Sequence, residues 1–316
     1  MRTGAAAGHQ GYFHEALPYA SGDELLSVVV PFLLDGVAAG EPAVVAFGAD
    51  NAALVRAALP ADSGVEFLSG GDTYARPAGA IRAYRDLLGR RVAAGATQIR
   101  IVGELPRPAL GRTWDWWARY EAAINHAYDD FPLWSLCAYD TRHTPAAVLA
   151  DVGRTHPRFI RPGDRHEISP AYTEPRTFLT ENRPLLPDPL QEQPPHAELA
   201  DPTPGQARQA VREAAAGLTA AARDDLVVAV SETVTNAHRY GHPPARLSVW
   251  SDADRVVVAV SDAGEGPKDP FAGLLPNQDS APGGRGLWIT YQACDHVASA
   301  RDASGWTIRM ITGELD

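Results

Sequence analysis

The chain has 316 residues, which is enough for two domains that each bury a hydrophobic core. Its apolar fraction of 45% and charged fraction of 21% are typical of a globular protein. The net charge of -11 argues against direct nucleic-acid binding, because phosphate recognition depends on lysine and arginine.

Neither an export signal nor a membrane anchor is predicted from the N-terminal sequence. The opening MRTGAAAGHQ has no apolar core, and the longest apolar run of the chain, 25–34, is interrupted by Ser27 and Pro31. Cys137 and Cys294 are too far apart for a CxxC metal site and too few for a disulfide framework. We therefore expect a cytoplasmic protein with buried free thiols and no membrane partner.

Helical and strand patterns alternate through the first half of the chain. The predicted helices are 21–39, 51–59, 78–94, 113–128 and 145–152. The predicted strands are 43–47, 65–68, 99–103 and 133–139. Strands that alternate with helices imply βαβ units, so we predict an α/β fold whose parallel sheet is covered on both faces.

Ligands of such a sheet collect beyond the carboxyl ends of its strands. Glu104 directly follows the strand predicted at 99–103, which makes it the sharpest candidate, although it could equally cap a helix or pair with Arg107. His14 and Tyr19 precede the first predicted helix and are similar candidates for a sensory ligand. A lone histidine near a domain edge can equally be packed or solvated.

Three segments of this half stand out: GYFHEALPYASGDELLSVVVPFLLDGVAAGEPAVVAF, RIVGELP and LCAYDTR. They resemble the MEDS sensory domain, which is named from regulators of methanogens and methylotrophs. The resemblance covers about residues 10–165 and implies a RecA-like α/β domain without the P-loop. It also implies a small-molecule ligand, whose chemistry stays open.

A tryptophan cluster follows in the helix predicted at 113–128. Trp114 and Trp117 are three residues apart and share one helical face, which favours core packing, while Trp116 points elsewhere. The alternative is that the cluster lines an apolar pocket.

Proline recurs throughout the range 161–204, where few long apolar runs occur. Such a composition favours extended backbone and a semi-rigid spacer rather than a folded unit. We therefore expect a linker over 166–202 and a second domain over 203–316.

The second domain combines helices with strands. Thr203 and Pro204 predict the start of a helix at 205–218, and a second helix is expected at 224–242. The remaining elements expected are strands at 246–250 and 255–260, a helix at 287–294, and strands at 297–301 and 306–312. We expect a helical layer packed against a mixed sheet.

Three polar motifs occur in this domain in a fixed order. Glu232 and Asn236 are one helical turn apart and lie opposite the apolar side of their helix. An Asp-x-Gly-x-Gly turn follows a strand, and a glycine-rich turn opens the last helix. These two turns consist of Asp262, Gly264 and Gly266, and of Gly284, Arg285, Gly286 and Leu287. Taken singly, the motifs also fit an amphipathic helix, a surface turn and a flexible loop.

Together, the ordered motifs resemble the GHKL ATP-binding fold, and specifically the anti-sigma-factor serine kinases of bacteria. The resemblance covers about a third of the chain and implies a Bergerat α/β sandwich that binds ATP and Mg²⁺. A P-loop is absent, because Lys268 is the only lysine and stands in GPKDP rather than before serine or threonine. Another nucleotide-binding fold is therefore needed, which agrees with the resemblance.

The resemblance assigns a task to each motif. Asp262 accepts a hydrogen bond from the adenine amine, and Gly264 and Gly266 let the backbone approach the base and the following loop close as a lid. The turn from Gly284 to Leu287 receives phosphate at a helix N-terminus. Asn236 gives an oxygen ligand to Mg²⁺, and Glu232 is placed to accept a proton from an attacking hydroxyl.

The resembled kinases phosphorylate an anti-anti-sigma (STAS) partner and sequester a sigma factor, and dimerisation is common among them. We expect the same function here, regulated through the N-terminal domain. One alternative is a sensor histidine kinase, which would need a phosphoacceptor histidine on a dimerising helix, whereas His196 stands in proline-rich sequence. Another is an interaction module that binds ATP without transferring phosphate.

Overall fold

The computed structural model describes residues 2–68, 74, 76–276 and 285–313. The chain divides into two compact units, Met1–Leu179 and Thr180–Asp316. Among the described residues, no helix has both the length and the apolar character required to cross a bilayer.

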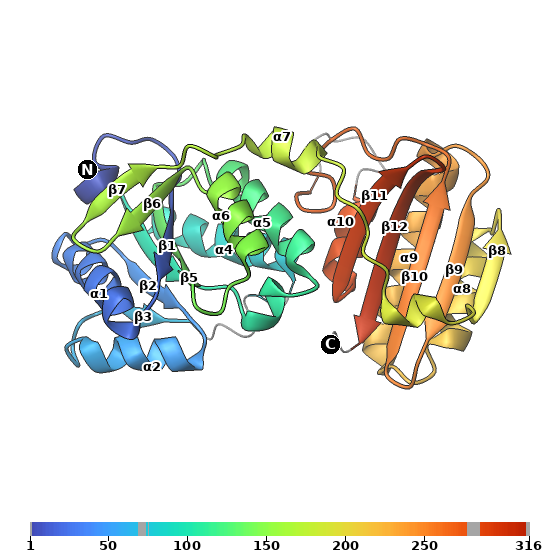
Figure 1. The fold of residues 1–316 in the computed structure, drawn as a ribbon, viewed down its shortest axis with the longest axis horizontal. Coiled ribbons are helices and arrows are strands. Elements are labelled where there is room, and N and C mark those ends of the chain that lie inside the picture. Colours follow the sequence, from blue (N-terminus) through green and yellow to red (C-terminus); the bar gives the residue numbers. More distant parts are fainter. Residues whose placement is uncertain (1, 69–73, 75, 277–284, 314–316) are drawn as a thin grey trace. The chain divides into compact units, whose positions relative to one another are not determined.

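The N-terminal unit is built on a seven-stranded sheet with the order β3-β2-β4-β5-β1-β6-β7 (Figure 1). Every neighbouring pair is parallel except β6 and β7, so the predicted parallel sheet gains one antiparallel edge strand. The strands are β1 (Phe13–Tyr19), β2 (Ala43–Ala46), β3 (Glu66–Phe67), β4 (Ile99–Gly103), β5 (Leu133–Asp140), β6 (Arg158–Arg161) and β7 (Arg165–Ile168).

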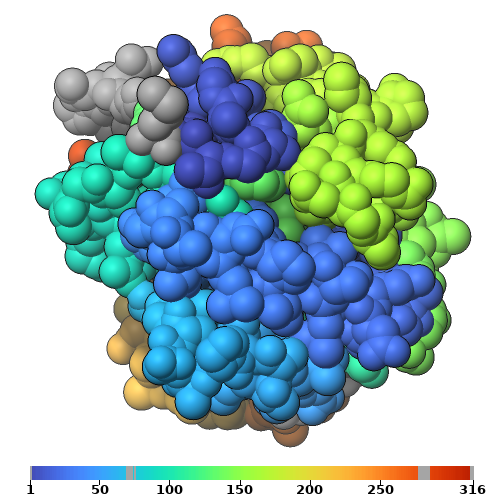
Figure 2. All heavy atoms as spheres, turned by 90° about the vertical axis from the view of Figure 1, so that its left-hand side faces the viewer, coloured from blue at the N-terminus to red at the C-terminus, as the bar shows by residue number. Residues whose placement is uncertain are grey.

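Helices cover both faces of this sheet. One face carries α1 (Gly22–Ala38) and α2 (Ala49–Ala58), which lie side by side at the surface in Figure 2. The other face carries α4 (Pro77–Ala93), α5 (Trp114–Ala127) and α6 (Ala146–Thr155). The described part of the unit also contains the 3₁₀ turns η1 (Gly4–Ala6) and η2 (Arg107–Leu110).

The interior strand β1 was not predicted, because its sequence FHEALPY has no apolar alternation. The strand is nevertheless buried, and its carboxylate Glu15 is fully enclosed. Trp134 Nε1 donates to Glu15 Oε2 over 2.8 Å, and His166 Nδ1 lies 2.8 Å from Glu15 Oε1. The hydrogen bond to Glu15 raises the pKa of His166. The buried carboxylate of Glu15 is thus stabilised by two side chains, Trp134 and His166, that lie far from β1 in the sequence.

The tryptophans of α5 belong to the core, as predicted for Trp114 and Trp117. Trp116 is also buried, with 1% of its surface exposed, and its ring centroid lies 6.4 Å from that of Trp117, so the expectation that it points elsewhere was wrong. The indole Nε1 of Trp114 donates to Asp151 Oδ2 over 2.9 Å, which fixes α5 to α6.

The C-terminal unit contains a five-stranded sheet with the order β11-β12-β10-β9-β8 (Figure 1). All its neighbouring strands are antiparallel, so the expectation of a mixed sheet was wrong. The strands are β8 (Ala197–Ala200), β9 (Arg246–Ser251), β10 (Arg255–Asp262), β11 (His296–Asp302) and β12 (Gly305–Gly313). The helices are α8 (Pro204–Ala214), α9 (Ala220–Tyr240) and α10 (Gly286–Ala293).

The range 166–202, which we expected to be a spacer, contains part of the folded structure. Besides β7 and β8 it holds α7 (Pro175–Thr180) and η3 (Pro189–Glu192), and each of these two helices begins with a proline. Leu190 of η3 packs against Val257 and Ile311 of the C-terminal sheet. Proline therefore marks the starts of short elements here.

A buried ion pair stabilises the N-terminal unit at β4. The side chains of Arg100 and Glu41 are each 3% exposed, and Arg100 Nε donates to Glu41 Oε2 over 2.7 Å. The other guanidinium nitrogens donate to Phe32 O and Thr3 Oγ1. The charge of Arg100 is thus compensated entirely by partners inside the protein.

Removal of one partner of this pair should be costly. Glu41→Ala should lower the free energy of unfolding by about 3–5 kcal/mol, because the guanidinium of Arg100 stays buried without a counterion. Glu66→Ala is the matched control: Glu66 forms an ion pair with Arg91 at the surface, so its loss should cost at most about 1 kcal/mol. Urea unfolding followed by tryptophan fluorescence measures both, and equal losses would contradict the assignment.

Candidate functional site

Helix α9 positions the acid–amide pair predicted from the sequence. Four residues on one side of the helix are buried and anchor it to the sheet: Leu226, Val230, Val234 and Ala237. Glu232 and Asn236 are half-buried. The apolar side therefore fixes the helix and leaves both polar side chains available at its margin.

The first residue of α10 lies directly against this pair. A β-carbon built on Gly286 would be 2.7 Å from Glu232 Oε2, which is closer than real β-carbons approach other atoms, and 3.0 Å from Asn236 Nδ2, which is tighter than most such contacts. The two helices are also joined by a hydrogen bond between the hydroxyls of Thr233 and Thr290, 3.4 Å apart. Glycine at position 286 therefore lets the N-terminus of α10 reach the acid–amide pair.

Asp262 ends β10 beside the C-terminus of α9. Its Oδ1 accepts hydrogen bonds from the backbone N–H groups of His242, at 3.2 Å, and Gly264, at 2.7 Å. The side chain is buried, and within the described residues Oδ2 has no hydrogen-bond partner. One oxygen is thus fixed by the backbone, and the other can accept a hydrogen bond from a ligand. The contribution of His242 escaped the sequence analysis, because a backbone donor has no residue signature.

Both glycines of the Asp262 turn lie where a side chain would clash with its surroundings. A β-carbon on Gly264 would be 2.6 Å from Asp262 Oδ1. Gly266 has φ +80°, and a β-carbon there would meet the indole of Trp306 at 2.5 Å. The predicted role of these glycines in a closing lid remains a prediction. The described part of that loop is anchored by Phe271 and Leu274, which are buried.

The remaining residues of the second glycine motif are only partly covered by the structure. Gly284 lies outside the described residues. Arg285 is exposed and immediately precedes α10, while Leu287 is half-buried in the first turn of that helix. Backbone N–H groups in this first turn have no partner within the helix, and the helix dipole places positive charge there.

These residues fit a magnesium-bound nucleotide. The C-terminal half of α9 carries a carboxylate and an amide oxygen, and the N-terminus of α10 favours an anion at the same place. Amide oxygen is a ligand type that Mg²⁺ accepts, and the free oxygen of Asp262 suits an amine donor. Glu232, Asn236 and Gly286 are brought together directly, and Asp262 joins them at the end of the same helix.

In the N-terminal unit, Tyr19 and Glu104 belong to one hydrogen-bonded group. Asn51 Nδ2 donates to Tyr19 Oη over 2.9 Å and to Glu104 Oε2 over 2.6 Å. Glu104 Oε1 accepts from the N–H of Gly48, which precedes α2, so its contacts resemble the helix-capping alternative. Burial raises the pKa of Glu104, and these hydrogen bonds oppose the rise. Asn51 was not predicted from the sequence.

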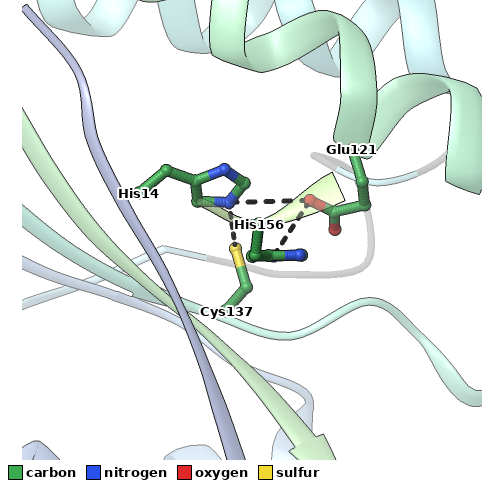
Figure 3. A group of neighbouring side chains, drawn as sticks. All are labelled: His14, Glu121, Cys137 and His156. Atoms are coloured by element: carbon green, nitrogen blue, oxygen red, sulfur yellow. Dashed lines mark hydrogen bonds and ion pairs between the residues drawn. The ribbon is translucent and has the colours of Figure 1, made fainter. Parts of the chain in front are cut away.

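His14 lies apart from that group, on the opposite face of β1, because positions 14 and 19 of a strand point to opposite sides. It is packed with Glu121, Cys137 and His156, none of which was predicted as a site residue (Figure 3). Burial raises the pKa of Glu121 to about 8 and lowers that of His14 to about 4, because both charged forms lose hydration. The sequence gives no motif for this cluster, because its four residues come from separate elements.

Two family models match the chain. The MEDS model, described as the methanogen/methylotroph, DcmR sensory domain, matches residues 13–157. The model of the histidine kinase-like ATPase domain matches residues 198–312, and such a domain implies ATP binding. No curated protein matches the sequence. Both resemblances are therefore confirmed at the level of the domain.

The contact at Gly286 predicts a specific effect of one added methyl group. Gly286→Ala should weaken Mg-ATP binding by about 5- to 150-fold, because its β-carbon would displace Glu232 and Asn236, and such packing conflicts cost about 1–3 kcal/mol. Gly205→Ala is the matched control, since a β-carbon there stays 3.8 Å from its nearest neighbours. Isothermal titration calorimetry measures both affinities. Wild-type affinity in Gly286→Ala would remove this contact from the site.

Proposed function

Because the chain combines a MEDS domain with a histidine kinase-like ATPase domain, we propose that it is an anti-sigma regulatory factor. In this proposal it is an ATP-dependent serine/threonine kinase that phosphorylates an anti-anti-sigma (STAS) partner and sequesters a sigma factor. The N-terminal domain supplies a small-molecule signal. The observation that supports the proposal best is the contact of Gly286 with the Glu232–Asn236 pair.

Nucleotide binding rests on three parts of the C-terminal unit. Asp262 Oδ2 accepts a hydrogen bond from the exocyclic amine of adenine, while Oδ1 stays fixed by the N–H groups of His242 and Gly264. Residues 284–287 and the N-terminus of α10 receive the phosphates, with Arg285 adding a positive charge. Asn236 provides an oxygen ligand for the magnesium ion.

Glu232 is the proposed general base. Mg-ATP supplies the phosphoryl group that is transferred, and the chain has to orient the attacking hydroxyl and remove its proton. Glu232 lies one turn before Asn236 on the same side of α9, so its carboxylate and the metal-binding amide face one place. Oε2 of that carboxylate lies next to Gly286, in the turn proposed to bind phosphate. A serine hydroxyl of the partner would give its proton to Glu232.

A sensor histidine kinase is the second candidate from the same domain family. It requires a histidine that accepts phosphate on a helix before the ATP-binding domain. His196 is exposed in a bend directly before β8, outside any helix. His238 lies within α9, and its Nε2 is 2.8 Å from Pro202 O. These surroundings favour transfer to a partner protein over transfer to the chain itself.

A third candidate is a module that binds ATP without transferring phosphate. Its binding site would have the same residues, so only a rate separates it from a kinase. Incubation with labelled ATP and candidate STAS proteins distinguishes the three functions. The proposal predicts a serine-phosphorylated partner, a histidine kinase gives an acid-labile label on this chain, and the binding module gives neither.

The role of Glu232 predicts a loss of transfer without a loss of binding. Glu232→Gln should reduce the rate of phosphotransfer by about 10²–10⁴-fold, because the amide cannot accept the proton, whereas Mg-ATP affinity should stay within a few-fold of wild type. Glu213→Gln, which changes an exposed carboxylate on α8, should leave both quantities unchanged. Full transfer activity in Glu232→Gln would show that Glu232 is not the base.

A pull-down experiment can identify the proposed protein partners. Pull-down from native cell extract, with and without ATP, should recover a sigma factor and a STAS protein in a nucleotide-dependent manner. Recovery of neither partner, together with ATP binding by the purified chain, would contradict the anti-sigma assignment while leaving the nucleotide site intact.

A further inference from the structure

Four potential metal ligands converge inside the N-terminal unit. His14 comes from β1, Glu121 from α5 and Cys137 from β5, and His156 is the C-cap residue directly after α6. Figure 3 shows their side chains pointing toward one another. One ligand atom from each residue can be chosen so that all four atoms lie within 4.8 Å of one another. The nucleotide site described above uses none of them.

The orientation of His14 is set by Asn125. The amide nitrogen of Asn125 donates to three backbone carbonyls, of Glu121, Ala122 and Thr155, so its oxygen is the atom that faces His14. His14 Nδ1 lies 2.9 Å from that oxygen and must therefore carry the proton. Its Nε2 consequently presents a lone pair, 3.3 Å from Cys137 Sγ and 3.8 Å from Glu121 Oε2.

His156 is fixed in the same tautomer by a backbone carbonyl. Its Nδ1 lies 3.0 Å from Val152 O, which can only accept a hydrogen bond, so Nδ1 carries the proton. Its Nε2 presents a second lone pair, 3.6 Å from Glu121 Oε2. Each imidazole thus has one nitrogen tied to an oxygen acceptor and the other directed at the cluster. This arrangement is typical of histidines that bind metals.

The carboxylate of Glu121 is oriented in a comparable way. Tyr139 Oη donates to Glu121 Oε1 over 3.0 Å, which leaves Oε2 directed at the two imidazoles. Oε2 and His156 Nε2 are both buried, and neither has a hydrogen-bond partner within the described residues. No arginine or lysine in the described part of the chain forms an ion pair with Glu121. A buried carboxylate that faces two imidazole lone pairs is satisfied either by a proton or by a cation held between these atoms.

The distances and the donor types agree with one kind of ion. Four ligands arranged tetrahedrally around zinc are about 3.3–3.6 Å apart, given Zn–N of about 2.0–2.1 Å and Zn–S of about 2.3 Å. The three pairs given above span 3.3 to 3.8 Å. Two imidazoles, one thiolate and one carboxylate form a mixed set that suits Zn²⁺ better than Mg²⁺ or Ca²⁺, which prefer oxygen.

We propose that His14, Glu121, Cys137 and His156 bind a divalent metal ion of the zinc class inside the N-terminal domain. The ion joins β1, β5, α5 and α6, which the sequence places far apart. Cys137 is only partly buried and also lines a cavity of about 30 Å³, together with five tyrosines and other residues. The thiolate is therefore the ligand that a small molecule in this cavity would meet. The proposal is independent of the proposed kinase function.

Metal content and cobalt spectroscopy test the site on the full-length chain. The purified protein should retain about one zinc ion per chain after desalting, measured by inductively coupled plasma mass spectrometry. Removal of the ion with a chelator should lower the melting temperature of the N-terminal unit. Replacement by Co²⁺ should give a near-ultraviolet thiolate-to-cobalt charge-transfer band with the absorption of a tetrahedral site.

The two cysteines of the chain make a matched pair of variants. Cys137→Ser should lose the thiolate–cobalt band and most of the bound zinc. Cys294→Ser, which changes a cysteine in the C-terminal unit, should retain both, and any thiolate band in it can come only from Cys137. His143→Gln, at an exposed histidine after β5, should also retain the ion.

Two results would overturn the proposal. One is a wild-type chain that carries no zinc and gives no thiolate–cobalt band, which would mean that protons alone satisfy the cluster. The other is a band that disappears in Cys294→Ser and persists in Cys137→Ser. If Cys137→Ser fails to fold, the spectrum of Cys294→Ser still decides, because Cys137 is then the only cysteine.

Discussion

The contact between the first residue of α10 and the acid–amide pair of α9 is the constraint on which the C-terminal unit depends. Gly286 has no side chain, so the N-terminus of α10 can lie against Glu232 and Asn236. The positive end of one helix is thereby held beside the acid–amide pair of another. Asp262 is fixed at the end of α9 by backbone N–H groups, which completes one side of the site. Helices α9 and α10 and the end of β10 can then bind the magnesium ion, the phosphates and the adenine base of one nucleotide.

The N-terminal unit buries several polar side chains in a mostly parallel sheet. Arg100 is neutralised by Glu41, and Glu15 is hydrogen-bonded by Trp134 and His166. Burial of such groups is tolerated only when each charge finds a partner. Glu121 differs, because its surroundings offer lone pairs rather than positive charge. This contrast is the physical basis for placing a cation there.

The sequence predicted those parts of the fold whose signals are local. Thr203 and Pro204 predicted the start of α8, and the capping contacts with Gln206 confirm it. The strand β1 was missed, because His14, Glu15 and Pro18 break its apolar pattern, and the partners of His14 and Glu15 lie far along the chain. The glycine motifs predicted where the backbone makes close approaches. They could not predict donors such as the N–H of His242, or a cluster assembled from four distant elements.

In the proposed function, the C-terminal unit binds ATP through the free oxygen of Asp262. The most direct test of this claim compares the affinities of the full chain for Mg-ATP and Mg-ITP, because hypoxanthine carries a carbonyl where adenine carries the amine. A hydrogen bond to a charged group contributes about 1.5–3 kcal/mol, so ATP should bind at least about tenfold more tightly than ITP. Equal affinities for the two nucleotides, or no binding of ATP, would contradict the claim.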